Sequence, residues 1–233
     1  KSGAYDAALQ GCSRLVFHYG SFVAESKSSY NGTHSWAVHA DGGQCVMNIS
    51  VSVKGVREGK GTFEANFVLA DGTAIQTMSG SLYTHKVTAP TAQTMNDSPT
   101  TLKYEPATGC SCPIMNGNRS TVTIGENWQL RMVNGQPAMT YGYICMCLGV
   151  VSCCFIPGCA AVCCPRTGLQ HEVVPNGLRN GQGRSIEKTG MDCGRKPLDG
   201  HVIEFAPDMK TDMRKDMITA VVFHAIAPMG YSE

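Results

Sequence analysis

Apolar and polar residues alternate over short segments through much of the first half of the chain. Side chains two positions apart lie on the same face of a β-strand, so each alternating segment predicts a strand with one apolar and one polar face. The apolar members of these segments are Ile49, Val51, Val53, Phe63, Ala65, Phe67, Leu69, Val122 and Ile124. The pattern favours antiparallel β structure in which one face of the sheet is covered.

Turn signals separate these segments. Asp41-Gly42, Asp71-Gly72 and Asn134-Gly135 each lie between two strand-like segments, and both residues of such pairs tolerate the positive φ angles of tight hairpins. We therefore predict three hairpins. Residues 88–101 are polar and contain two prolines, which favours a long surface connection there.

A helical pattern appears near the C-terminus, over about residues 208–227. Asp208 is its candidate N-cap, and the stretch from Met217 to Ala227 is apolar on all sides except at His224. A helix that is apolar all round is buried inside protein, and this stretch is shorter than the ~20 residues that span a bilayer. We expect His224 to be a core residue rather than a base. The expected core residues of this helix are Met213, Met217, Val221 and Phe223.

The simplest arrangement that buries such a helix is one in which the predicted strands surround it. The sequence thus predicts a mainly β chain that forms a single domain over residues 1–233. We expect a closed antiparallel β-barrel with hairpin connections, wrapped around the buried C-terminal helix.

Composition narrows the function classes. The formal net charge is +1, with no basic arm interleaved with aromatic residues, which argues against nucleic acid as a partner. Residues 166–196 hold an excess of Arg and Lys, as expected beside an anionic membrane face. Because the chain starts at Lys1 rather than at Met, we expect a processed or trimmed chain.

The longest uncharged stretch runs from Met132 to Pro165 and includes the cysteine-rich segment 138–165. An uncharged segment of this length is expected to be buried in protein or in lipid. Several acylated cysteines would supply the multiple signals that stable membrane anchoring needs. The candidate residues for lipid attachment or membrane contact are Cys153, Cys154, Cys159, Cys163, Cys164 and Arg166.

Three other interpretations of these cysteines stay open. Residues 141–164 are long enough for a transmembrane helix. Cys110 and Cys112, with Cys145 and Cys147, form two C-x-C steps for a metal, although structural zinc usually has C-x2-C spacing. The cysteines could also be buried thiols or disulfides in a core.

The tail carries a family resemblance. The segment from Ile203 to Met209, with Phe205 and Asp208, leads into Met213-Arg214 and then into the apolar run from Ala220 to Ile226. This order resembles the C-terminal segment of phospholipid scramblases, which belong with the LURP-one proteins to the tubby-like superfamily. The resemblance implies a closed barrel threaded by the helix, palmitoylated cysteines, and a non-enzymatic protein that binds membrane lipid or a membrane protein and moves phospholipid between leaflets.

Scramblases also carry an acidic, calcium-binding-like segment before this helix. In that register Pro197 falls on the first acidic position, while Asp199 and Asp208 remain as candidate calcium ligands. A calcium loop needs several carboxylates and a bidentate acid at its end, so this departure weakens the calcium prediction. The alternative is that Asp199 is a turn residue and Asp208 a helix cap. No other cofactor is expected.

Glycosylation signals support an alternative function. The sequons begin at Asn31, Asn48, Asn96 and Asn118, all before the uncharged stretch. Together with Cys12, Cys45, Cys110 and Cys112 they suggest a secreted or surface β-domain, disulfide-bonded and N-glycosylated, with a structural or adhesive role.

Enzyme signals are sparse. The chain has no G-x-S-x-G motif, P-loop or dinucleotide fingerprint. The glycine-rich residues 177–183 are better explained as a flexible loop. A hydrolase with Cys193 as nucleophile, beside Asp192 and Arg195, is a minor alternative. The sequence therefore leans against an enzyme.

Overall fold

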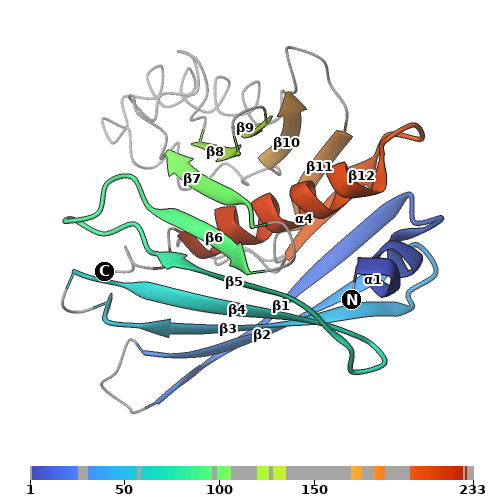
Figure 1. The fold of residues 1–233 in the computed structure, drawn as a ribbon. Coiled ribbons are helices and arrows are strands. Elements are labelled where there is room, and N and C mark those ends of the chain that lie inside the picture. The colour runs from blue at the N-terminus through green and yellow to red at the C-terminus, as the bar shows by residue number, and fades with distance from the viewer. Residues whose placement is uncertain are drawn as a thin grey trace, which may run out of the picture.

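The computed structural model describes residues 2–25, 31–56, 59–95, 99–105, 120–125, 128–134, 169–174, 181–186, 200–227 and 229. These ranges contain twelve strands and two helices (Figure 1). The strands are β1 (Arg14–Ala24), β2 (Gly32–Ala40), β3 (Cys45–Lys54), β4 (Thr62–Leu69), β5 (Ala74–Ser81), β6 (Thr91–Met95), β7 (Thr101–Glu105), β8 (Ser120–Ile124), β9 (Trp128–Asn134), β10 (Leu169–Val174), β11 (Gly181–Ile186) and β12 (Gly200–Phe205). The helices are α1 (Ser2–Leu9) and α4 (Thr211–Ile226).

The strands form one antiparallel sheet in sequence order. Each strand from β1 to β12 pairs with the next one along the chain. β1 also pairs with β12, where Leu15 lies opposite Ile203, so the order of paired strands returns to its start. The predicted mainly β, antiparallel architecture with a C-terminal helix is confirmed.

The apolar face of the sheet covers α4. Figure 1 shows α4 running between β1–β5 on one side and β6–β9 on the other. Phe223 stacks on Phe63 of β4, with ring centroids 5.8 Å apart, and meets Tyr104 of β7 edge-on at 6.4 Å. Met217, Val221 and Phe223 are at most 1% exposed, whereas Met213 is half-buried. Met217, Val221 and Phe223 thus lie in the core of the molecule.

The alternating positions also lie where the sequence predicts them. All nine apolar residues of the alternating segments are buried, and most of the residues between them are exposed or half-buried. Because side chains of a strand alternate between its faces, each of these strands contributes one apolar row to the core.

Two predicted hairpins are confirmed, with one change of detail. β2 and β3, and β4 and β5, are joined by four-residue loops. In the β4–β5 loop Gly72 has the expected positive φ of 89°, and Thr73 N–H donates to Asp71 Oδ1 over 2.8 Å. In the β2–β3 loop the left-handed residue is Gly43 (φ 75°) rather than Gly42. The third predicted turn begins at Asn134, the last residue of β9, and its continuation lies outside the described residues.

The predicted surface connection over residues 88–101 is wrong. β6 occupies Thr91–Met95, and β7 begins at Thr101. β6 buries only Ala92 and Thr94, so its inner row has a small and a polar residue where the other strands have large apolar ones. Thr94 is accommodated because its hydroxyl accepts a 2.8 Å hydrogen bond from the Thr100 N–H.

The helix begins three residues after the predicted N-cap. Lys210 has the extended backbone of an N-cap, without a side-chain capping bond, and Asp208 lies exposed in the preceding turn. Met209 is buried between them, and its carbonyl accepts a 3.0 Å hydrogen bond from Arg214 Nε. Burial of Met209 and this bond therefore determine where the helix starts.

Close packing of β5 on β6 makes Gly80 a sensitive position. A Cβ atom at Gly80 would overlap the Thr91 carbonyl oxygen and lie 2.7 Å from Ala92 Cα, both of them backbone atoms. We expect Gly80→Ala to lower the free energy of unfolding by about 1–3 kcal/mol, because the two strands must separate. Urea denaturation measures this loss. Gly42→Ala is the matched control, since no atom lies within 4 Å of its Cβ position; equal stability losses in both variants would contradict the prediction.

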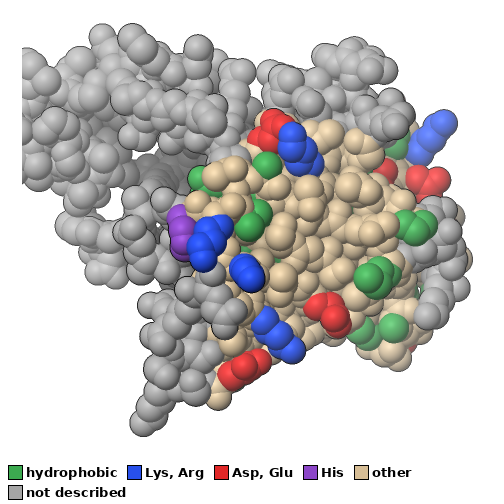
Figure 2. Space-filling model, turned by 60° about the vertical axis from the view of Figure 1, so that its left-hand side comes forward, with side chains coloured by type: hydrophobic (Ala, Val, Ile, Leu, Met, Phe, Trp, Pro, Cys, Tyr) green, Lys and Arg blue, Asp and Glu red, His purple; other side chains and the backbone are tan. Residues whose placement is uncertain are grey.

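The exposed surface is mixed in character. On the face drawn in Figure 2, acidic and basic side chains are interspersed and hydrophobic side chains occur in separate small areas. Val23 (68% exposed) and Met95 (63%) are the large hydrophobic residues most exposed in the part of the chain that the structure describes. Scattered single apolar residues are normal on protein surfaces, so this face by itself does not indicate a docking site.

Candidate functional site

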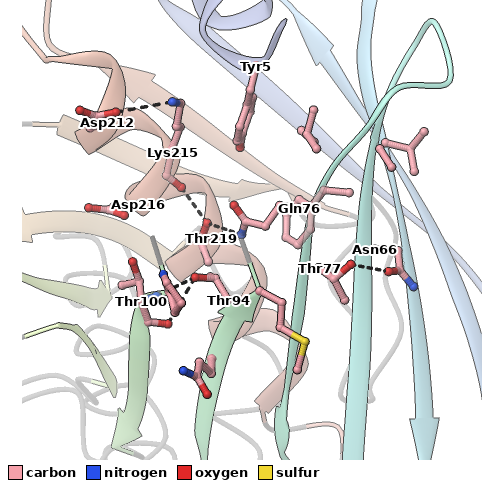
Figure 3. Close-up of a pocket in the computed structure, with 17 residues that line it drawn as sticks. Tyr5, Asn66, Gln76, Thr77, Thr94, Thr100, Asp212, Lys215, Asp216 and Thr219 are labelled. Carbon is pink, nitrogen blue, oxygen red and sulfur yellow. Dashed lines mark hydrogen bonds and ion pairs between the residues drawn. The ribbon is translucent and has the colours of Figure 1, made fainter. Parts of the chain in front are cut away.

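A cavity of about 860 Å³ lies where the first turns of α4 meet the sheet (Figure 3). Its walls come from α1, β4, β5, β6, the residues before β7, and α4. This volume falls within the range of about 300–1,000 Å³ typical of small-molecule sites. We refer to it as the α4 pocket.

The floor of the α4 pocket is a buried hydrogen-bonded pair. Gln76 of β5 and Thr219 of α4 are 7% and 4% exposed. Gln76 Nε2 donates to Thr219 Oγ1 over 3.1 Å, and that hydroxyl donates to the Lys215 carbonyl over 2.8 Å. Buried polar groups are costly without partners, so this chain of bonds holds the pair in place. Gln76 Oε1 accepts no hydrogen bond from a described residue.

Hydroxyl and amide groups form the neighbouring wall. Thr77 Oγ1 donates to Asn66 Oδ1 over 2.9 Å, between adjacent strands β5 and β4. Thr94 and Thr100 connect β6 to the start of β7 through the bond already described. The polar lining residues that the structure describes are Thr, Gln, Asn, Tyr, Asp and Lys, which supply hydrogen bonding and ion pairing.

Charges in the α4 pocket come from the first turns of α4. Lys215 Nζ pairs with Asp6 of α1 and lies 3.5 Å from Asp212 Oδ1. Asp216 makes no hydrogen bond or ion pair with a described residue. Burial, and then the negative charge of Asp212, raise the pKa of Asp216, while Lys215 partly offsets this. The negative charge at Asp216 is therefore incompletely compensated.

Tyr5 closes the pocket from the α1 side. Its side chain is 4% exposed, and its buried hydroxyl has no hydrogen-bond partner among the described residues. Figure 3 shows the hydroxyl pointing toward Gln76 and Thr219. Burial, and then the charge of Asp216, raise the pKa of Tyr5 far above its ordinary value. Tyr5 thus stays protonated and remains a hydrogen-bond donor without an acceptor.

Arg214 holds α1 against α4. Its Nη1 donates to the carbonyl oxygens of Cys12 and Leu9, over 2.8 and 3.3 Å, and its guanidinium lies 5.1 Å from the centroid of the Phe205 ring. Leu9 is the last residue of α1, and its carbonyl also accepts a 3.2 Å hydrogen bond from the Cys12 N–H, so Arg214 binds the C-terminal end of this helix. The position of Tyr5 therefore depends on a contact between the two ends of the chain.

Most site residues predicted from the sequence are not among the residues that the structure describes. Those that fall outside the described residues are Cys153, Cys154, Cys159, Cys163, Cys164, Arg166, Asp199, Asn96 and Asn118. Asp208 is exposed, and among the described residues no three His, Cys, Asp or Glu side chains are grouped to hold a metal. Asn48 is exposed on β3, whereas Asn31 is half-buried and its Oδ1 accepts a 2.9 Å hydrogen bond from Gly55 N–H.

The sequence pattern alone does not reveal the α4 pocket. Its key residues come from three distant parts of the sequence: Tyr5, Gln76, and the helix residues Lys215, Asp216 and Thr219. The available signal was the group of charged residues that precedes the apolar part of the helix, Asp212, Arg214, Lys215 and Asp216. Comparisons with family models, with curated proteins and with solved structures found no match to this chain.

Proposed function

We propose that this chain is a non-enzymatic, membrane-associated protein with a tubby-like barrel that binds lipid through its cysteine-rich segment. The observation that best supports the proposal is the enclosure of α4 by strands, with Phe223 packed between Phe63 and Tyr104. The ring-like order of paired strands, in which β1 lies between β2 and β12, supports a closed barrel. Because α4 fills the interior of the sheet around Phe223, we assign the lipid-binding function to the loops.

Strand pairing adds a constraint on the cysteine-rich segment. Asn134, the last residue of β9, lies opposite Leu169, the first residue of β10. The two residues that flank the segment 135–168 are therefore neighbours in the sheet. A single membrane crossing would put these neighbouring strands on opposite sides of the bilayer. The pairing thus favours an anchor that enters and leaves on one side, as an acylated loop does, over a single transmembrane span.

The two membrane interpretations also differ in what they require of helices. Neither of the two described helices has both the length and the hydropathy needed to cross a bilayer, and the candidate spanning residues 141–164 lie outside the described residues. Acylated cysteines beside Arg166 require no spanning helix, because lipid chains together with basic residues supply the binding energy. If the resemblance extends to activity, the protein moves phospholipid between leaflets without covalent chemistry.

Acyl-exchange labelling in a eukaryotic expression host tests this proposal. We expect hydroxylamine-dependent labelling and recovery in the membrane fraction, both lost when Cys153, Cys154, Cys159, Cys163 and Cys164 are replaced by Ser. The matched control replaces Cys12 and Cys45, which carry free thiols in this structure, and we expect it to behave like the wild type. An unlabelled chain that is recovered wholly without membranes would overturn the proposal.

A secreted or surface β-domain is the second candidate. Exposure of Asn48, on the outer face of β3, favours it, because a glycan there would project away from the core. Its disulfides are not supported by Cys12 and Cys45, since neither is bonded in this structure. A glycosidase-sensitive mass shift that is lost in Asn48→Gln would support this candidate, and an unmodified Asn48 in a secreting host would remove it.

A further inference from the structure

The geometry points to the α4 pocket as a binding site for a soluble, hydroxylated amine of about the size of an amino sugar, with its ammonium group on Asp216 and a hydroxyl or carbonyl oxygen on Tyr5. This inference does not rest on the membrane proposal. It concerns a different part of the molecule and different residues.

Tyr5 is the residue that favours a hydrogen-bond acceptor on the ligand. Its hydroxyl is buried, protonated and without a partner among the described residues. An unpaired buried donor costs about 1–3 kcal/mol relative to a hydrated or bonded one. A ligand oxygen that reaches the floor of the pocket would accept this bond and recover that free energy.

Asp216 is the residue that favours a positively charged group on the ligand. Lys215 does not fully compensate the carboxylate of Asp216, because its ammonium group is already paired with Asp6 and lies near Asp212. A ligand ammonium group would compensate the carboxylate in a partly buried place, where charge-assisted hydrogen bonds are the stronger kind.

The two anchors, Tyr5 on α1 and Asp216 on α4, set the length that the ligand must span. Lys215 and Thr219 are four residues apart and share the face of α4 that turns to Tyr5 and Gln76, whereas Asp216 lies about 100° further around the helix. Figure 3 shows Asp216 on the other side of this turn from Tyr5. A bare ammonium ion has no oxygen to accept the Tyr5 hydrogen bond, whereas a molecule with both an ammonium group and a hydroxyl or carbonyl oxygen can meet both groups, and the cavity of about 860 Å³ has room for one.

The side chains that line the pocket indicate the chemical character of the rest of the ligand. Threonine, glutamine and asparagine side chains lie between the two anchors, with smaller apolar areas contributed by residues such as Phe67 and Ile75. Such a surface suits hydroxyl groups on a compact carbon frame. An acyl chain would instead strip these polar groups of water without replacing their hydrogen bonds.

Calorimetric titration of the full chain with glucosamine, and with N-acetylglucosamine as the uncharged counterpart, tests the assignment. We expect saturable binding of glucosamine and at least about tenfold weaker binding of the acetylated sugar, since one charged hydrogen bond is worth about 1.5–3 kcal/mol. Asp216→Asn should weaken glucosamine binding to a similar degree. Asp208→Asn, a matched change at an exposed Asp outside the pocket, should leave it unaltered.

Tyr5→Phe supplies an independent readout that does not need Asp216 to be altered. Removing an unpaired buried hydroxyl should raise the melting temperature of the ligand-free chain, while the lost bond should weaken glucosamine binding about threefold to tenfold. A higher melting temperature together with weaker glucosamine binding would distinguish a residue that donates a hydrogen bond to the ligand from one that only stabilises the fold. Absence of saturable glucosamine binding at millimolar concentration, or equal affinities in the wild type and Asp216→Asn, would overturn the inference.

Discussion

Replacing Phe223 by alanine is expected to lower the free energy of unfolding by about 3–5 kcal/mol, the range measured for large aromatic residues removed from protein cores. Phe223 has no exposed surface and contacts the rings of Phe63 and Tyr104 from two different strands. The variant would therefore lose the transfer free energy of the ring and leave a cavity between α4 and both sides of the sheet.

Equilibrium denaturation in urea measures this change. Val23→Ala is the control at a 68% exposed position, where we expect a change within about 0.5 kcal/mol. Phe223→Leu retains most of the volume and should lose less, which keeps the comparison informative if the alanine variant does not fold. A loss below about 1 kcal/mol in Phe223→Ala would contradict the enclosed position of α4, and the tubby-like proposal with it.

The second large effect is a loss of stability in acid that originates at His224. Its side chain is 8% exposed and lies 5.5 Å, ring to ring, from Tyr104. Burial lowers the pKa of His224 from 6.5 to about 4. Between these values the unfolded chain binds a proton at this imidazole and the folded chain does not.

The sign of the effect follows from that difference. When the unfolded state binds more protons, the free energy of unfolding falls as the pH falls. The contribution of His224 is thus fully retained above about pH 6.5 and decreases until about pH 4, where the folded form is protonated too. A shift of this size corresponds to about 3 kcal/mol at 1.36 kcal/mol per pKa unit.

Urea denaturation of the wild type and of His224→Gln at several pH values between 7 and 4 tests this prediction. We expect the wild type to lose about 3 kcal/mol more than the variant over that range. Burial also lowers the pKa of half-buried His34, so His34→Gln serves as the control and should remove a smaller part of the loss. Parallel stability curves for the wild type and His224→Gln would show that position 224 does not titrate in this way.

The β architecture was largely predictable because it depends on local pattern. Phe63, Ala65, Phe67 and Leu69 share one face of a strand whatever lies beside them, and all four are buried. The turn at Asp71-Gly72 likewise carries its own conformational preference, and it forms where expected. The stretch from Met217 to Ala227 is apolar on almost all sides and must be surrounded by other parts of the protein. Its burial could therefore be inferred before the surrounding elements were known.

Prediction failed where neighbours rather than local sequence set the outcome. β6 has small and polar inner residues, so its strand is supported by pairing with β5 and β7. The start of α4 was misplaced because buried Met209 and the Arg214 bond override the capping preference of Asp208. α1 had no strong signal of its own, and Arg214 holds it from the far end of the chain.

The sequence by itself determined which residues are apolar on one face, where two tight turns form and which helix must be enclosed, because each of these depends on residues within a few positions of one another. Only the tertiary structure decided that Tyr5, Gln76, Asp216 and Thr219 line one cavity, and that Asn134 and Leu169, at the ends of β9 and β10, are paired neighbours. Such groupings depend on contacts between distant segments, and no local pattern of polar and apolar residues encodes them.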